Sequence, residues 1–289
     1  MVIAITGAGG QLGRELADAV RGAGHEAVAA GRGRCDIAEP GAARRLLEEC
    51  RPDAVVNCAA WTNVDGAESS PDAAYRANAV GPRLLAAACH AAGVRLCQIS
   101  TDFVFDGEAG GPVDEWATAR PLSVYGASKL AGEEEVRALC PAHQIVRTAW
   151  LFGRDGPNFV LTMLRLARER PELRVVADQE GSPTWTGHLA PAVLRLLELG
   201  TPGTYHLTNS GAARRHQWAA AVVDLAGLHT PVIPVSVDEF PLPARRPRSA
   251  VLDNRAWRLL GEAPLPDWRE GVRGYLSTLG VTGGPAARR

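Results

Sequence analysis

The first half of the chain alternates short apolar runs with helical patterns, and this alternation restricts the fold more than any other feature of the sequence. The apolar runs predict buried strands at Val2–Thr6, 27–30, 54–58, 94–100 and 144–149. The helical patterns between them cover 11–22, 42–50, 71–92 and 121–139. Right-handed crossovers join strands and helices of this spacing into a parallel sheet that is covered on both faces. We therefore predict an α/β fold with a doubly wound parallel sheet.

Proline and glycine interrupt the second half more often, most densely between 231 and 247. Helical patterns persist at 159–169, 188–199 and 215–225, with one strand pattern at 204–208. We predict a smaller, loop-rich α/β lobe formed by about 150–186 and 211–282. The main domain then comprises 1–149 and about 187–210, and 283–289 is expected to be a frayed tail.

Composition and charge exclude several classes of protein. The 289 residues are 46% hydrophobic and 22% charged, which is ordinary for a folded globular chain. A net charge of −1 without a basic stripe argues against a nucleic-acid partner. The N-terminus lacks signal-peptide features, and no apolar run approaches the ~18 residues that cross a bilayer. Six scattered cysteines without a Cys-x-x-Cys pair favour free thiols in a reducing cytoplasm and argue against a zinc site.

Three glycines, Gly7, Gly10 and Gly13, follow the first predicted strand and open the first helix. Gly7 and Gly10 let the backbone turn tightly and approach a pyrophosphate, and Gly13 permits close helix–strand packing. The helix N-terminus adds N–H donors and a positive dipole end. The spacing is G-x-x-G-x-x-G, and in this strand–turn–helix context it predicts a dinucleotide site in a Rossmann-type domain.

The end of the second strand bears on the choice of dinucleotide. It lacks the acidic residue that binds ribose hydroxyls in NAD-specific folds, and Arg32 and Arg34 stand there instead. Guanidinium groups at this point favour a 2′-phosphate and hence NADPH. The alternative is that both arginines are exposed loop residues, and NADH remains possible.

Tyr125 and Lys129 are four residues apart, so on a helix they share one face. A lysine ammonium beside a phenol stabilises the phenolate and lowers the tyrosine pKa from its usual ~10. Such a tyrosine can protonate an oxygen as hydride reaches the adjacent carbon. Thr101 ends a predicted strand upstream and supplies a further hydroxyl. We predict that Thr101, Tyr125 and Lys129 are catalytic.

With these motifs the chain resembles the short-chain dehydrogenase/reductase superfamily in its extended form, and within it the dTDP-4-dehydrorhamnose reductase family. The resemblance runs nearly from end to end. Its most specific segments are Ser-Thr-Asp at 100–102 and Asp-Gln-Glu-Gly-Ser-Pro-Thr at 178–184. Further matching segments are Asp36-Ile37, Val64-Asp-Gly-Ala-Glu68, Arg147-Thr-Ala-Trp150, Asn158-Phe159 and Arg246-Pro247.

The resemblance implies NADPH-dependent reduction of the C4 carbonyl of a dTDP-linked 4-keto-6-deoxyhexose, namely dTDP-4-dehydro-L-rhamnose to dTDP-L-rhamnose. Thr101 would hydrogen-bond the sugar carbonyl, Tyr125 would protonate the alkoxide, and Lys129 would steady Tyr125 and the nicotinamide ribose. The main domain would bind NADP(H), and the lobe would bind the nucleotide sugar. The further cofactor-binding residues implied are Gln11, Leu12, Asp36, Ile37, Ala59, Ala60 and Thr62. The further substrate-binding residues implied are Asp102, Trp150, Asn158 and Arg246.

The chain also departs from the family pattern. Phe103 replaces a tyrosine and Trp61 a histidine or tyrosine, which alters the mouth of the pocket. The segment 187–191 lacks the carboxylates with which some members bind a divalent cation at a dimer interface, and Glu15 alone is a poor Mg²⁺ ligand set. We expect no required metal and a monomer or weak homodimer.

Two alternatives stay open. One is a sister reductase that acts on another dTDP-4-keto-deoxysugar, such as a dihydrostreptose-type or secondary-metabolite sugar. The other is a catalytically silent regulatory subunit, which the intact Thr101, Tyr125 and Lys129 argue against.

Overall fold

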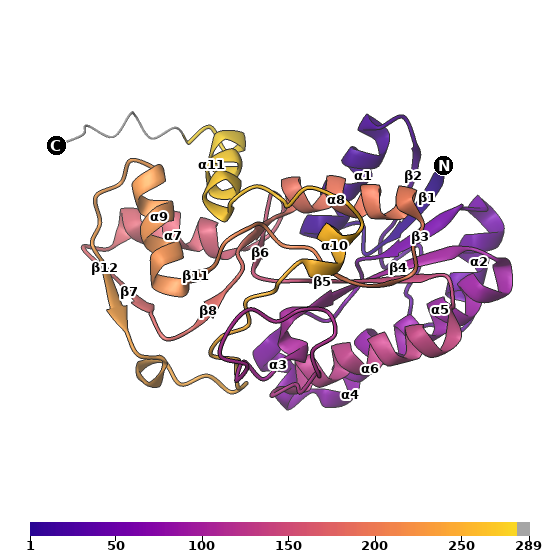
Figure 1. Ribbon diagram of the computed structural model, residues 1–289, viewed down its shortest axis with the longest axis horizontal. Coiled ribbons are helices and arrows are strands. Elements are labelled where there is room, and N and C mark those ends of the chain that lie inside the picture. The colour runs from indigo at the N-terminus through magenta and orange to yellow at the C-terminus, as the bar shows by residue number, and fades with distance from the viewer. Residues whose placement is uncertain (282–289) are drawn as a thin grey trace.

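The computed structural model describes residues 1–281, and a six-stranded sheet forms the centre of the protein (Figure 1). Every neighbouring pair of strands in this sheet is parallel. The strands, in spatial order, are β10 (Gly203–His206), β5 (His143–Thr148), β4 (Arg95–Thr101), β3 (Ala54–Asn57), β1 (Val2–Thr6) and β2 (Glu26–Ala30). The order reverses between β1 and β3, as in a Rossmann-type sheet. The predicted doubly wound α/β fold is confirmed.

Two apolar layers cover the sheet, because successive strand side chains point to opposite faces. On one face Ile3 and Ile5 pack against α1 (Gln11–Gly22) and α8 (Thr186–Leu199). On the other face Ala4 packs against apolar residues of α2 (Ala42–Cys50), α5 (Gly81–Ala92) and α6 (Val124–Leu139). Strands buried on both faces explain the continuous apolar runs in the sequence.

The helical pattern over 71–92 is interrupted in the structure. It comprises α4 (Pro71–Tyr75), a π-helical turn η1 (Arg76–Val80) and α5, and α3 (Val64–Ser69) precedes them. Pro82 has no N–H to donate and its ring clashes with a carbonyl one turn earlier, so the backbone widens ahead of it. The prediction of one regular helix here was wrong for this reason.

The helix predicted from residue 121 begins instead at Val124. Ser123 is its N-cap, and the Ser123 hydroxyl accepts a hydrogen bond from the N–H of Gly126 at 3.1 Å. This cap sets the first turn of α6, which carries Tyr125.

The second half of the chain builds a smaller lobe at the left of Figure 1. A core that includes Phe152, Trp218, Trp268 and Tyr275 holds it together. Its helices are α7 (Phe159–Glu169), α9 (Arg215–Leu225) and α11 (Trp268–Thr278). Its paired strands are β7 (Leu173–Val176) with β12 (Val232–Val235), β8 (Glu180–Gly181) with β11 (Ala213–Arg214), and β6 (Leu151–Phe152) with β9 (Thr184–Trp185). The second half also contains the short helices η3 (Val237–Glu239) and α10 (Arg255–Leu259). A third short helix, η2 (Asp102–Val104), follows β4 in the first half.

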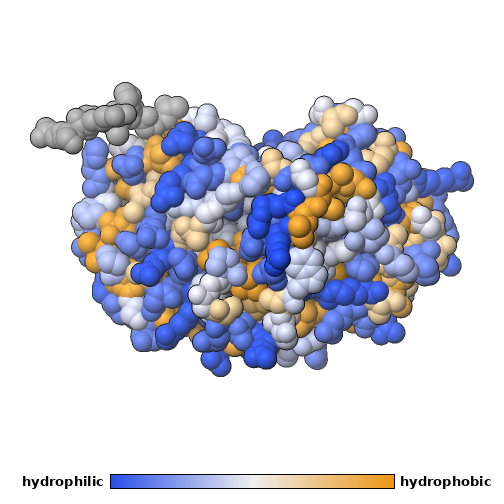
Figure 2. Space-filling view, viewed as in Figure 1, coloured by the Kyte–Doolittle hydropathy of each residue, from blue (hydrophilic) through white to orange (hydrophobic). Residues whose placement is uncertain are grey.

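The surface shown in Figure 2 is mostly hydrophilic, with hydrophobic residues scattered among charged ones. Within residues 1–281, no helix has both the length and the apolar character needed to span a membrane. The tail predicted at 283–289 lies outside the described residues.

Candidate active site

The carboxyl ends of the central strands open into a cleft of about 980 Å³. Residues that follow β1, β2, β3, β4 and β5 line one side, and Arg215 and Arg246 of the second half line the other. A cleft at the switch point of a doubly wound sheet is where such folds bind ligands. The lining includes the catalytic residues predicted from the sequence and, with one exception described below, every predicted binding residue.

The glycine turn after β1 fits a pyrophosphate. Gly7 has a φ of 65°, and a Cβ there would lie 2.4 Å from the backbone nitrogen of Ala59. A Cβ on Gly13 would lie 2.5 Å from the carbonyl oxygen of Gly7, so strand and helix approach closely. Gly10 caps α1 in an extended conformation without a side-chain cap, and the first turn has no acidic residue. The first N–H groups of α1 therefore face the cleft as donors for an anion.

Arg32 follows β2 and lines this cleft beside Asp36. Its side chain is 83% exposed, and its Nε lies 3.4 Å from Oδ2 of Asp36, which also lines the cleft. Exposed ion pairs of this kind are weak, so Arg32 can turn to a phosphate. Arg34 is placed differently, because its guanidinium donates to Glu49 at 2.6 Å. The structure thus places Arg32, and not Arg34, at the cleft.

Further predicted cofactor residues line the middle of the cleft. Ile37, Ala59, Ala60 and Thr62 are all part of its wall, as are Gln11 and Leu12. Gln11 also donates from Nε2 to the carbonyl oxygen of Pro157 at 3.2 Å, which connects α1 to the second half of the chain. Its Oε1 is buried and has no hydrogen-bond partner among the described residues.

The three predicted catalytic residues lie together, although they come from β4 and α6. Thr101 is 7% exposed, Tyr125 9% and Lys129 4%. The Lys129 Nζ donates to the carbonyl oxygen of Ile99 at 2.7 Å. The Thr101 hydroxyl donates to Oδ1 of Asp102 at 3.0 Å and lies close to the Tyr125 hydroxyl. Burial lowers the pKa of Lys129 to about 8, against the opposing charge of Glu133.

One expectation about Tyr125 is corrected. Burial raises its pKa to about 12, and the hydrogen bond with Thr101 opposes the shift only in part. Lys129 does not lower the pKa of this phenol, because its amine points to Ile99. The phenol is therefore protonated at neutral pH, which is the state required of a proton donor.

Asp102, next to Thr101 in the cleft wall, is 2% exposed, and its Oδ2 has no partner among the described residues. Burial raises the pKa of Asp102 to about 6, while the Thr101 hydrogen bond and the charge of Arg215 act in the opposite direction. Trp150 forms part of the same wall and has a φ of 45°, an uncommon value for a bulky residue. Its ring stacks on that of Trp218, with centroids 5.6 Å apart.

Arg215 is a cleft residue that the sequence did not reveal. Its guanidinium carbon lies 3.7 Å from the centroid of the Trp150 ring. Burial lowers its pKa to about 10, with Asp102 opposing the shift. It stands at the start of α9 among other arginines, without a motif around it, so only the fold brings it to the cleft. Arg246 also lines the cleft but is paired with Asp65, at 2.8 and 3.1 Å.

Asn158 is the exception among the predicted residues, because it does not line the cleft. Its Oδ1 caps α7 by accepting from the N–H of Leu161, and its Nδ2 donates to the carbonyl of Gly153 and the hydroxyl of Tyr275. Both amide hydrogens are thus used within the lobe. A contact between Asn158 and a sugar stays a prediction.

Comparison with known proteins agrees with this geometry. The model of the RmlD substrate binding domain family matches residues 1–281. The chain belongs to this family. A dTDP-4-dehydrorhamnose reductase of Streptomyces griseus is 44% identical over 92% of this chain and 90% of its own length. A dTDP-4-keto-6-deoxy-D-glucose reductase of Streptomyces niveus is 41% identical over 91% and 92%.

A solved structure of an RmlD-family relative shows the same fold. The dTDP-4-dehydrorhamnose reductase of Bacillus anthracis, determined in complex with NADP, has a TM-score of 0.94 and 38% identity. The match covers 96% of this chain and all of that one. The resemblance that the motifs indicated is confirmed.

Within residues 1–281, no cluster of three or more His, Cys, Asp and Glu side chains could hold a metal ion. Glu15 is 3.3 Å from Nε of Arg154 and so forms an ion pair.

Proposed function

We propose that the protein is an NADPH-dependent reductase that converts the C4 carbonyl of dTDP-4-dehydro-L-rhamnose to the hydroxyl of dTDP-L-rhamnose. The observation that carries this proposal is the buried Thr101, Tyr125 and Lys129 group in the same cleft as a glycine turn suited to a dinucleotide. The name of the Streptomyces griseus relative supports this substrate.

The residues of the chain account for the proton and the charge in this reaction. When bound, the nicotinamide supplies the hydride. Tyr125, protonated at neutral pH, gives its proton to the oxygen that becomes an alkoxide at C4. The Thr101 hydroxyl, whose single proton goes to Asp102 in the unliganded cleft, would turn that proton to the same oxygen when the substrate binds. Lys129 lies in the same cleft, where its amine would hold the nicotinamide ribose beside Tyr125.

The substrate would lie between the strand ends and the second half of the chain. The unpaired Oδ2 of Asp102 is placed to accept a hydrogen bond from a sugar hydroxyl, and Trp150 supplies an apolar wall. The diphosphate needs cations, which Arg215 and Arg246 provide. We assign the larger share to Arg215, because Asp65 already neutralises Arg246.

We propose NADPH as the preferred cofactor, with Arg32 on its 2′-phosphate. The complex of the Bacillus anthracis relative with NADP supports this preference. Loss of a charge-assisted phosphate contact costs about 1.5–3 kcal/mol, so Arg32→Ala should reduce the NADPH-over-NADH preference by ~10-fold or more. Arg34→Ala is the matched control. Equal KM values for NADPH and NADH in the unaltered enzyme would refute the assignment.

A sister activity is the second candidate, since the Streptomyces niveus relative is named for a different dTDP-4-keto sugar. The experiment that separates the two is NADPH oxidation measured with a panel of dTDP-4-keto-6-deoxyhexoses of both configurations. The proposal expects the highest kcat/KM for dTDP-4-dehydro-L-rhamnose. A higher value for another sugar would favour the sister activity, and no oxidation with any sugar would favour a silent subunit.

A further inference from the structure

The helix that carries Tyr125 and Lys129 also carries Glu133, one turn further along. Residues four apart follow one helix face, so these three side chains form a row on α6. Tyr125 and Lys129 line the cleft, and Glu133 does not. It is 0% exposed, beneath the floor of the site. Burying a carboxylate costs free energy unless its charge is paired and its oxygens accept hydrogen bonds.

Side chains from β4, β5 and α6 saturate the Glu133 carboxylate. The Ser100 hydroxyl donates to Oε1 at 2.5 Å. Arg147 donates from Nε to Oε1 at 2.9 Å and from Nη2 to Oε2 at 2.7 Å. Arg137 donates to Oε2 at 2.7 Å. These bonds hold the pKa of Glu133 below its ordinary value despite its burial, so it is a carboxylate at neutral pH.

Two of the bonds in this region fasten the end of β4 to α6. Ser100 immediately precedes Thr101 and donates to Glu133, and Lys129 donates to the carbonyl of Ile99 on the other side of Ser100. Thr101 and Tyr125 come from different elements and must lie within hydrogen-bond reach of one sugar oxygen. Glu133 therefore helps to set the distance between the two hydroxyls.

The charges around Lys129 point to a second effect of Glu133. Cys58, beside Lys129, is neutral because burial raises its thiol pKa to about 12, and Tyr125 is neutral for the same reason. Asp102, at the end of β4, is half-neutralised by burial near pH 6. His206 of β10, beside Arg147, is neutral because burial lowers its pKa to about 3. Among the neighbouring groups, the charge of Glu133 does most to oppose the lowering of the Lys129 pKa by burial.

We infer that Glu133 is a positioning residue of the reductase: its carboxylate holds the Ile99–Thr101 segment against α6 through Ser100, and its negative charge acts on the Lys129 amine one helical turn away. The inference rests on the proposed function, because it concerns the same proton donor. It assigns Glu133 no contact with substrate or cofactor.

The test is the pH dependence of kcat and of the NADPH dissociation constant in Glu133→Gln. The amide accepts the Ser100 bond but lacks the charge, so the pKa of Lys129 falls and the alkaline limb of both profiles moves to lower pH. For a shift of one unit, kcat falls ~10-fold on the alkaline side and changes little near pH 6. The NADPH measurement needs no sugar, so it remains informative if the proposed substrate is wrong.

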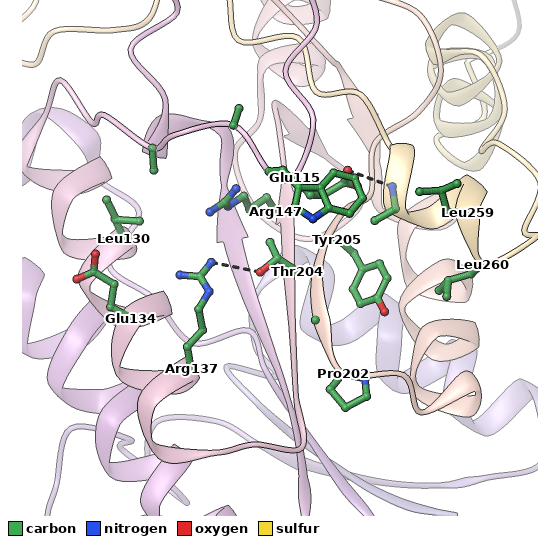
Figure 3. Close-up of a pocket in the computed structure, with 15 residues that line it drawn as sticks. Glu115, Leu130, Glu134, Arg137, Arg147, Pro202, Thr204, Tyr205, Leu259 and Leu260 are labelled. Atoms are coloured by element: carbon green, nitrogen blue, oxygen red, sulfur yellow. Dashed lines mark hydrogen bonds between the residues drawn. The ribbon is translucent and has the colours of Figure 1, made fainter.

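Glu133→Gln leaves Arg147 buried without its partner, which can unfold the protein. The double variant Glu133→Gln/Arg147→Met removes both charges at similar volume and should show the same alkaline shift. Arg137→Met is the matched control. Arg137 lines a groove of about 720 Å³ and donates there to Thr204 (Figure 3). Arg137→Met keeps the Glu133 carboxylate, so the alkaline limb of this variant's profiles should not move to lower pH.

Three outcomes can be told apart. A shifted alkaline limb in the Gln and double variants, but not in Arg137→Met, supports the inference. Folded Gln or double variants with the unaltered protein's profiles for both kcat and NADPH binding would overturn it. Lack of sugar reduction by the unaltered protein, with shifted NADPH profiles in the variants, would refute the proposed substrate alone.

Discussion

The proposed role of Tyr125 as the proton donor can be tested directly by removing its hydroxyl. Tyr125→Phe removes only the phenolic hydroxyl. The ring and its edge-to-face contact with Phe103, at 5.5 Å between centroids, can persist. General acid catalysis contributes ~10²–10⁴-fold, so kcat should fall at least ~10² while NADPH affinity stays within about threefold. Stopped-flow NADPH oxidation and fluorescence titration measure the two quantities. A kcat near that of the unaltered enzyme would remove Tyr125 from the mechanism.

Arg215 gives a second prediction at the scale of single residues. Arg215→Met keeps the contact with Trp150 but removes the charge. If Arg215 binds the diphosphate, KM for the nucleotide sugar rises by ~10-fold or more, since a charge-assisted bond contributes about 1.5–3 kcal/mol. The exposed Arg245, directly after the buried Ala244, provides the control Arg245→Met, which should change KM little. Equal effects of the two changes would contradict the role of Arg215.

At the scale of elements, the π-helical turn and α6 are packed through a glycine. A Cβ at Gly132 would lie 2.0 Å from the carbonyl oxygen of Asn78, in the widened turn before Pro82. The Asn78 side chain in turn donates to Ser128 of α6 and to the carbonyl of Trp61, near the cleft. The irregular turn therefore aligns the helix of Tyr125 with the loop after β3 that lines the cleft.

Gly132→Ala should consequently destabilise the protein, whereas alanine is normally favoured over glycine in a helix. Overpacking of this kind costs about 1–3 kcal/mol, which lowers Tm by several degrees. The matched control is Gly22→Ala at the end of α1, where a Cβ meets nothing within 4 Å and stability should rise slightly. Differential scanning calorimetry on both variants measures the contrast. An unchanged or higher Tm for Gly132→Ala would show that α6 can shift without cost.

At the scale of the whole molecule, His206 couples stability to pH. It is 0% exposed, and burial with the nearby Arg147 lowers its pKa to about 3. Below the unfolded value of ~6.5 the unfolded chain binds a proton that the folded chain does not, so His206 lowers stability as pH falls. Asp102 acts in the opposite sense, because its folded pKa of about 6 exceeds its unfolded value.

The effect of His206 is therefore measured as a difference. Relative to His206→Asn, the free energy of unfolding of the unaltered protein should fall by ~1.4 kcal/mol per pH unit between about pH 6.5 and 4. Urea titrations at a series of pH values give this slope, and the exposed His229→Asn is the control. Parallel curves for the unaltered protein and His206→Asn would contradict the shift.

The sequence predicted those features that depend on neighbours along the chain. Ile3 and Ala4 follow the strand period, and Tyr125 and Lys129 follow the helix period, so their faces are local properties. Arg215 and Asn158 depend on long-range folding: the first is brought to the cleft by α9, and the second is used to cap α7. The raised pKa of Tyr125 likewise arises from burial, which no spacing of residues reveals.

The return of α8 and β10 to the central sheet has a consequence for how such a chain can be divided. The edge strand beside β5 and the helix that covers the apolar stripe of α1 both come from the second half of the sequence. A fragment ending after residue 149 would expose the free backbone edge of β5 and the leucines of α1, and such surfaces aggregate. The two halves therefore cannot be exchanged as separate modules, and recombination within this family must preserve the whole span from β1 to β10.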